Sequence, residues 1–201
     1  MNSSPAIRRR SLGLDTVSLR EPSTARIASF REGLADAGWS YTDVGATRGA
    51  LPAGWDTDAY SVPLGGPEVF DRAVDAVARW VMFDLPWVRM DPASRQQPGE
   101  LVAFASRQLG VWMLHGCRTV YRIDEPDRVG FGYGTLSGHA VAGEEQFLVT
   151  RTDDGVVYSV RKFSRLDHPL AKLAGGVARS LQHRFSVESG LRMQRECAPV
   201  R

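Results

Sequence analysis

The chain has 201 residues, 43% of them hydrophobic, which is enough for one well-filled core and too short for two comfortable domains. Its 25 basic and 23 acidic residues nearly cancel, so no strong field favours nucleic acid or an anionic membrane. No apolar run approaches the ~18 residues of a membrane helix. The two cysteines, Cys117 and Cys197, form neither a disulfide framework nor a zinc motif. We therefore expect a cytoplasmic protein with no cofactor and no membrane span.

Residues 1–38 are predicted to form an N-terminal arm and an accessory helix. The first 20 residues are polar and unpatterned, which is typical of a solvated tail. A short amphipathic helix is expected from Pro22, capped by Ser23 or Thr24 and ended by Gly38. Its apolar face would carry Ile27, Phe30 and Leu34.

The main domain is predicted to span residues 39–201. A strand is expected from Trp55 to Leu64, followed by a helix with Pro67 in its first turn. This helix should continue until Pro86 stops it. Its apolar stripe consists of Phe70, Ala73, Val74, Val77, Trp80 and Val81.

The middle of the chain has the pattern of consecutive short strands separated by turn residues. The clearest hairpin turn is Asp153-Asp154-Gly155. A long helix is expected from about Asp167, with Leu170, Leu173, Val177 and Leu181 on one face. Such an order predicts an α+β fold in which the last helix lies across a curved antiparallel sheet. The predicted strands are Trp87 to Met90, Glu100 to Gln108, Val111 to Asp124, Arg128 to Leu136, Glu144 to Thr152 and Val156 to Ser164.

The stretch at residues 129–149, VGFGYGTLSGHAVAGEEQFLV, combines unusual backbone with reactive side chains. Its first strand alternates bulky residues with Gly130, Gly132 and Gly134. Bare backbone on one face of a strand predicts the close approach of a helix or a ligand. The turn that follows brings His139 and two carboxylates to the mouth of a hairpin. We expect any reactive or binding site to lie beside this hairpin.

This stretch and three others resemble one family. The others are YTDVGATRGALPAGW (41–55), CRTVY (117–121) and FSR (163–165), and the resemblance covers roughly residues 39–185. The pattern GFxYGTLxGHxxxGEExF is specific to the domain-of-unknown-function family numbered nineteen-ninety. The resemblance implies the START-like (SRPBCC) helix-grip superfamily, in which a curved antiparallel sheet wraps a long C-terminal helix and encloses an apolar cavity. It supplies no reaction, because a fold alone does not fix function.

Only one of Glu144 and Glu145 can face such a cavity, because adjacent strand residues point to opposite faces. Glu145 shares its parity with Phe147 and Val149, so we place it inward. Apolar neighbours favour the uncharged form of a carboxyl group, which would suit Glu145 as a general acid. The alternative is a structural ion pair of either glutamate with Arg118, Arg122 or Arg161.

Several other residues could support this acid. His139 in the turn and His115 at the start of a strand are candidate proton partners. The alternatives are a capping role for His139 and a place at the edge of the core for His115. Asp43 in the early motif is a further candidate catalytic residue, which would orient the ligand, or else it only bonds within its loop. The expected ligand-binding residues are Tyr41, Arg48, Trp112, Tyr133, Glu144 and Tyr158.

Two functions remain after sharper motifs are set aside. The glycines of the first strand lack the helix of a phosphate loop. No histidines have metal-ligand spacing, and basic residues are too scattered for a nucleic-acid stripe. The first hypothesis is an enzyme that dehydrates or cyclises an apolar natural product without a cofactor. An example is spiroacetal closure of a polyketide, since aromatase/cyclases are among the relatives that the resemblance implies. The alternative is a carrier of an apolar ligand.

Overall fold

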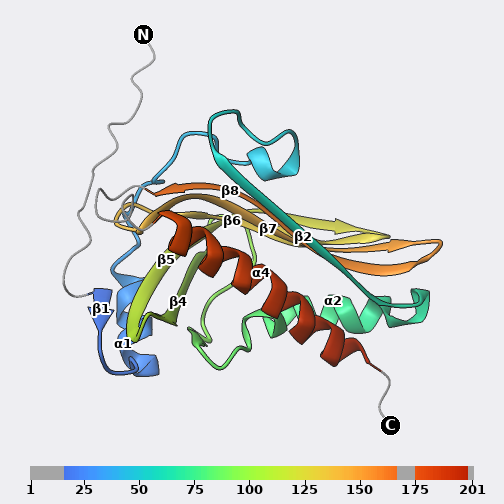
Figure 1. Cartoon of the computed structure of the whole chain (residues 1–201), viewed down its shortest axis with the longest axis horizontal. Coiled ribbons are helices and arrows are strands. Elements are labelled where there is room, and N and C mark those ends of the chain that lie inside the picture. Colours follow the sequence, from blue (N-terminus) through green and yellow to red (C-terminus); the bar gives the residue numbers. More distant parts are fainter. Residues whose placement is uncertain (1–15, 167–174, 199–201) are drawn as a thin grey trace.

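One curved antiparallel sheet forms the centre of the fold, in a computed structural model whose described residues are 16–166 and 175–198 (Figure 1). Its strands follow the order β2-β8-β7-β6-β5-β4-β3, with β1 pairing beside β5. The strands are β1 (Val17–Ser18), β2 (Asp56–Gly65), β3 (Val88–Met90), β4 (Leu101–Gln108), β5 (Val111–Glu125), β6 (Arg128–Thr135), β7 (Val141–Thr152) and β8 (Gly155–Leu166).

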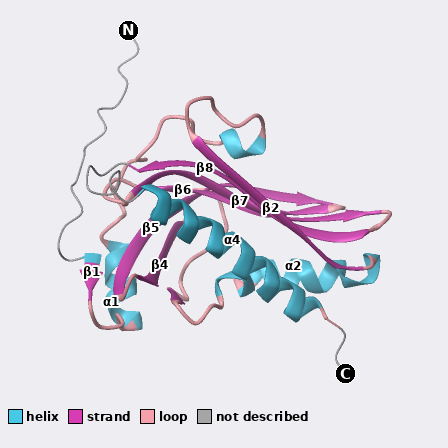
Figure 2. Ribbon diagram, in the orientation of Figure 1, coloured by secondary structure: helices cyan, strands magenta, loops and turns pink. Residues whose placement is uncertain are grey.

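The helices lie against this sheet as the predicted α+β arrangement requires. Helix α4 (Gly175–Cys197) crosses the concave face diagonally, and α2 (Phe70–Ala78) lies beside its C-terminal half (Figures 1 and 2). Helix α1 (Thr24–Glu32) packs against β4 and β5. Three short 3₁₀ turns complete the helical elements among the described residues. They are η2 (Ala46–Arg48), η3 (Pro67–Val69) and η4 (Val81–Phe83). The helix-grip prediction is confirmed.

The N-terminal prediction is partly wrong. Residues 1–15 lie outside the described residues, but Val17 and Ser18 pair with β5 and so do not belong to a free tail. The Ser23 hydroxyl caps α1 by accepting the Arg26 backbone N–H at 3.2 Å, as predicted. The helix ends earlier than expected, with Gly33 rather than Gly38 as its C-cap.

The predicted helix before Pro86 is also shorter than expected. It stops at Ala78, and Trp80 adopts a left-handed conformation with φ of 60°. The η4 turn then buries three consecutive side chains, Val81, Met82 and Phe83. A continuous helix would turn one of three successive side chains toward solvent, so the break lets all three join the core.

Small residues let α4 approach the sheet closely. Ser186 and Ser189 are fully buried, and a Cβ on Gly190 would lie 2.5 Å from the Tyr60 ring of β2. The predicted apolar positions Leu170 and Leu173, and the side chains of Val177 and Leu181, lie outside the described part of the structure. The described half of the helix therefore combines close approach at small residues with core packing by Phe185 and Met193.

The outer face of the sheet is covered as well. Helix α1 places Ile27 against Trp112 and Leu114, and the segment 39–55 covers β6, β7 and β8. The glycines of β6 lie under this cover. A Cβ on Gly132 would meet the Tyr121 ring at 2.5 Å, and one on Gly134 would overlap Tyr41. The bare strand face is approached closely, as predicted, but by the rings of Tyr121 and Tyr41 rather than by a helix or a ligand.

Candidate functional site

A cavity of about 300 Å³ lies on the concave side of the sheet, near the turn between β6 and β7. Strands β4 to β8 form most of its wall, and Phe185 of α4 closes one side. Apolar side chains make up much of the surface, including Trp87, Phe104, Met113, Tyr133 and Leu166. Among the polar residues in its lining are Ser106, His115, His139, Glu145 and Lys162.

Glu145, Lys162 and Tyr133 form one polar cluster in this wall. The Tyr133 hydroxyl donates to Glu145 Oε2 at 2.8 Å, and Lys162 Nζ lies 3.2 Å from Glu145 Oε1. Burial raises the pKa of Tyr133 well above its usual value, so it remains a phenol and donates. Lys162 Nζ also reaches Ser186 of α4 at 2.8 Å and Asp58 of β2 at 3.6 Å.

The structure corrects the environment expected for Glu145. Its carboxyl group lies on the concave face, but it is paired with an ammonium group rather than surrounded by apolar side chains. The partner is Lys162, directly opposite in the β7–β8 register, and not Arg118, Arg122 or Arg161. A signal was present, since Lys162 is one of only two lysines in the chain. It also shares its strand parity with the core residues Tyr158 and Val160.

His115 and His139 form a second polar cluster. His115 Nδ1 lies 3.1 Å from His139 Nε2, and His115 Nε2 lies 2.8 Å from Ser106 Oγ. The backbone N–H of Val141 donates to His139 Nδ1 at 3.0 Å. Burial lowers the pKa of His139 to about 4 and that of His115 well below its usual value, so both imidazoles are neutral at pH 7. His115 also stacks on Phe104, with ring centroids 4.7 Å apart.

Glu144 points to the opposite face and has a structural environment. Its side chain is 2% exposed and accepts hydrogen bonds from the Tyr41 hydroxyl at 2.7 Å and the Gly45 backbone N–H at 2.6 Å. The backbone N–H and hydroxyl of Thr47 donate to its other oxygen. This carboxylate therefore fixes the 41–48 segment to β7.

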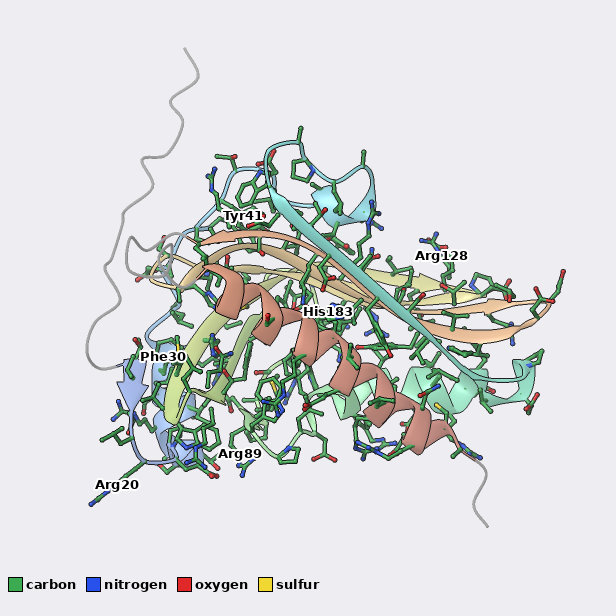
Figure 3. All side chains as sticks on the ribbon, in the orientation of Figure 1. Arg20, Phe30, Tyr41, Arg89, Arg128 and His183 are labelled. Atoms are coloured by element: carbon green, nitrogen blue, oxygen red, sulfur yellow. The ribbon has the colours of Figure 1, made fainter. Side chains whose placement is uncertain are left out.

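Five predicted site residues consequently lie away from the cavity. Tyr41, Asp43 and Arg48 belong to the segment that Glu144 holds on the outer face, and Figure 3 shows Tyr41 on that side of the strands. Trp112 packs beneath α1. Tyr158 is fully buried under α4, where its hydroxyl lies 3.4 Å from Ser189 Oγ. The early motif is held by Glu144, which points to the outer face. The cavity lies on the opposite face, toward which the next residue, Glu145, points.

The cavity thus gathers the side chains of four predicted residues, Glu145, His139, His115 and Tyr133. Residues that the sequence analysis missed also line it, among them Lys162 and Ser106. In residues 16–166 and 175–198, no group of three His, Cys, Asp or Glu side chains is arranged to hold a metal ion. Over the same residues, no helix combines the length and apolarity needed to cross a membrane.

The chain matches one family model over residues 40–192, with the description "Domain of unknown function (DUF1990)". The chain belongs to the DUF1990 family. This DUF1990 protein is 36% identical over 152 residues to a UPF0548 protein of Dictyostelium discoideum, with 67% of this chain and 69% of that protein covered. It is 34% identical over 183 residues to the UPF0548 protein of Deinococcus radiodurans, with 83% and 91% covered.

Solved structures that match part of this fold include two aromatase/cyclases. The Zhui aromatase/cyclase from Streptomyces sp. R1128 has a TM-score of 0.49 and 15% identity, over 71% of the DUF1990 chain and 93% of that chain. The di-domain ARO/CYC BexL from the BE-7585A biosynthetic pathway has a TM-score of 0.49 and 17% identity, over 75% and 52%.

Proposed function

We propose that this protein is an enzyme that binds an apolar small molecule in the cavity and performs cofactor-independent acid/base chemistry on it. Dehydration or ring closure, such as spiroacetal formation on a polyketide, is the reaction type. The observation that carries the proposal is the presence of two buried clusters of titratable side chains in the wall of one apolar cavity.

Binding alone would not require these clusters. Apolar walls supply most of the affinity for a small hydrophobic ligand, with a few polar groups to orient it. Burying a lysine–glutamate pair is costly, and such pairs are often replaceable by apolar residues without loss of stability. Lys162 is 5% exposed, and it lies at the cavity with Glu145 although β8 could present an apolar residue there. Function is a reason to retain such a pair.

The reaction can be written with these groups alone. The Glu145 carboxylate removes a proton from the ligand, while the departing hydroxyl oxygen takes a proton from the Lys162 ammonium. Water leaves, and Glu145 returns its proton to Lys162, 3.2 Å away, so the protein is unchanged. Tyr133 orients the carboxylate by donating to its other oxygen. In a spiroacetal closure, the same proton donor helps a hemiketal lose water before a ligand hydroxyl attacks. Positioned proton transfer contributes roughly 10²–10⁴-fold.

A non-catalytic carrier is the second candidate, and one observation favours it. No buried side-chain nitrogen or oxygen among the described residues lacks a hydrogen-bond partner. Each buried polar atom of the described wall therefore has at least one partner without a ligand, as in a site that binds mainly through apolar contact.

The two candidates differ in the fate of the bound compound. The purified protein is incubated with extracts of the cells that make it and followed over time by native mass spectrometry. Wild type, Glu145→Gln and Glu100→Gln are compared, because Glu100 is exposed and lies outside the cavity. If the protein is an enzyme, wild type and Glu100→Gln convert the ligand, whereas Glu145→Gln binds the ligand but does not convert it. Recovery of the same unaltered ligand from all three proteins would instead establish a carrier.

A further inference from the structure

The hydrogen bonds of the histidine cluster run in one fixed direction. The starting point is the Val141 backbone N–H, which can only donate, and it donates to His139 Nδ1. A neutral imidazole has one protonated nitrogen, so the His139 proton is on Nε2. That proton is directed at His115 Nδ1, 3.1 Å away. His115 must then carry its own proton on Nε2, which faces Ser106 Oγ at 2.8 Å.

Ser106 is the end of this series, and its hydroxyl proton has no acceptor among residues 16–166 and 175–198. A serine oxygen has two acceptor positions and one proton. His115 Nε2 occupies one position, and Gln108 Nε2 donates to the other at 3.2 Å. Among the described residues, no acceptor for the Ser106 proton is found within hydrogen-bonding distance. Ser106 is 2% exposed and lines the cavity, so the remaining direction is toward the space a ligand would occupy.

We propose that the Ser106 hydroxyl binds a carbonyl oxygen of the ligand, and that His139, acting through His115, is the positioning residue that directs it. The inference rests on the proposed function and deepens it by naming the substrate class. The ligand is an apolar ketone, aldehyde or ester whose carbonyl oxygen lies against β4, while the rest of the molecule occupies the aromatic part of the cavity.

The charges in the wall favour a neutral carbonyl compound over a carboxylate. Among the described residues, Glu145 and Lys162 are the charged side chains that face the cavity, and they are paired with each other. Glu144 contributes to the wall only near its backbone, because its carboxylate is held on the outer face by Tyr41 and Thr47. Both histidines are neutral at pH 7. An anionic ligand group would meet no unpaired cation in the described part of this wall, whereas a carbonyl oxygen needs only one donor.

His139 acts on the ligand only by controlling the tautomer of His115. Without the His139 proton, His115 is free to carry its proton on Nδ1. Its Nε2 then becomes an acceptor and takes the Ser106 proton at 2.8 Å. The serine donor would be lost to the ligand although neither Ser106 nor His115 had been changed. This consequence separates a positioning role from simple packing.

The test uses two compounds with the same carbon skeleton, 2-acetylnaphthalene and 2-ethylnaphthalene. Binding to the full-length protein is measured by fluorescence titration, and the carbonyl stretch of the bound ketone by infrared difference spectroscopy. Wild type should prefer the ketone and shift its carbonyl stretch to lower frequency. Ser106→Ala should lose about tenfold in ketone affinity, the size of one neutral hydrogen bond, with little change for the hydrocarbon. Gln108→Glu should have the same effect, because a carboxylate would accept the serine proton.

A second measurement follows the tautomer directly. The ¹⁵N shifts of His115 should show a protonated Nε2 and an unprotonated Nδ1 in wild type. In His139→Leu these shifts should move toward an average of the two tautomers, and the ketone preference should fall.

The outcomes separate this inference from the function it rests on. Hydrocarbon binding without any ketone preference, or a His115 proton found on Nδ1, overturns the inference and leaves the proposed function standing. Binding of neither compound overturns both.

Discussion

The Tyr41 hydroxyl donates to Glu144 Oε2 at 2.7 Å on the outer face of the sheet, while the next residue, Glu145, faces the cavity. Two adjacent carboxylates of one motif therefore have different environments. The first is enclosed by hydrogen-bond donors of the 41–48 segment. The second is paired with Lys162. Stability and ligand chemistry should accordingly respond to different substitutions.

Gly134→Ala should destabilise the protein by roughly 1–3 kcal/mol, the usual cost of overpacking a filled site. A Cβ at this position would overlap the Tyr41 side chain, which lies directly over the strand. Gly38→Ala is the matched control, because its Cβ would have only an ordinary contact with Ser137 Oγ at 4.0 Å. Urea unfolding of both variants measures the difference. Equal midpoints for the two would show that Tyr41 can move away from Gly134 without cost.

Glu144→Gln should lower the free energy of unfolding by about 2–4 kcal/mol, since the amide NH₂ would face a backbone N–H, of Gly45 or of Thr47, that can only donate. The affected contacts are those from Tyr41, Gly45 and Thr47. Affinity of the cavity for 2-acetylnaphthalene should be unchanged, because these contacts lie on the other face. Chemical unfolding and ligand titration on one sample give both numbers. A variant of normal stability with altered ligand binding would contradict this division between the two glutamates.

Lys162→Met should cost about 3–5 kcal/mol of stability, because removing one member of a buried ion pair leaves its partner's charge uncompensated. Both Glu145, 3.2 Å away, and Asp58, 3.6 Å away, lose their ammonium. Adding Glu145→Gln to this variant should restore part of the loss. A double-mutant cycle of urea unfolding energies gives the coupling, expected at about 1–3 kcal/mol. Simple additivity of the two single changes would mean that the pair contributes no interaction energy.

Stability should fall as the pH drops from about 6.5 to about 4, because of His115 and His139. Burial lowers the pKa of His139 to about 4, and that of His115 also lies below its usual value. An unfolded histidine takes up its proton near pH 6.5, so below that pH the unfolded chain binds protons that the folded chain refuses. The contribution of the neutral histidines is thus fully present above about pH 6.5. Each histidine adds a slope of up to about 1.4 kcal/mol per pH unit.

Unfolding free energies at pH 7.5, 6 and 5 test this slope. His139→Gln removes one of the two histidines that titrate differently in the folded and unfolded states. The stability of this variant should therefore depend less steeply on pH than that of wild type. Carboxylates titrate in both proteins and cancel in the difference. Identical slopes would show that His139 is protonated equally in the folded and unfolded states.

Local sequence patterns were sufficient to predict where the strands lie and to which face of the sheet a single side chain such as Glu145 points. Alternation and turn residues predicted the β4–β8 meander to within a few residues, and the parity of Glu145 with Phe147 placed it on the concave face. The reason is physical: side chains alternate with a period of two along any strand, whatever lies around it. Helix ends were less accurate, because the break at Trp80 follows from core packing rather than from a stop signal.

The partners of these side chains depended on segments distant in the chain. Lys162 meets Glu145 through the β7–β8 register, and Ser106 meets His115 through the β4–β5 register. Asp43 and Arg48 stand in the same motif series as Glu145, yet the loop carrying them covers the outer face. Sequence patterns determine which way a strand residue points, because that is a property of the local backbone. Which group it meets there is set by long-range packing, and this is why the charged pair and the serine–histidine series became visible only in the folded chain.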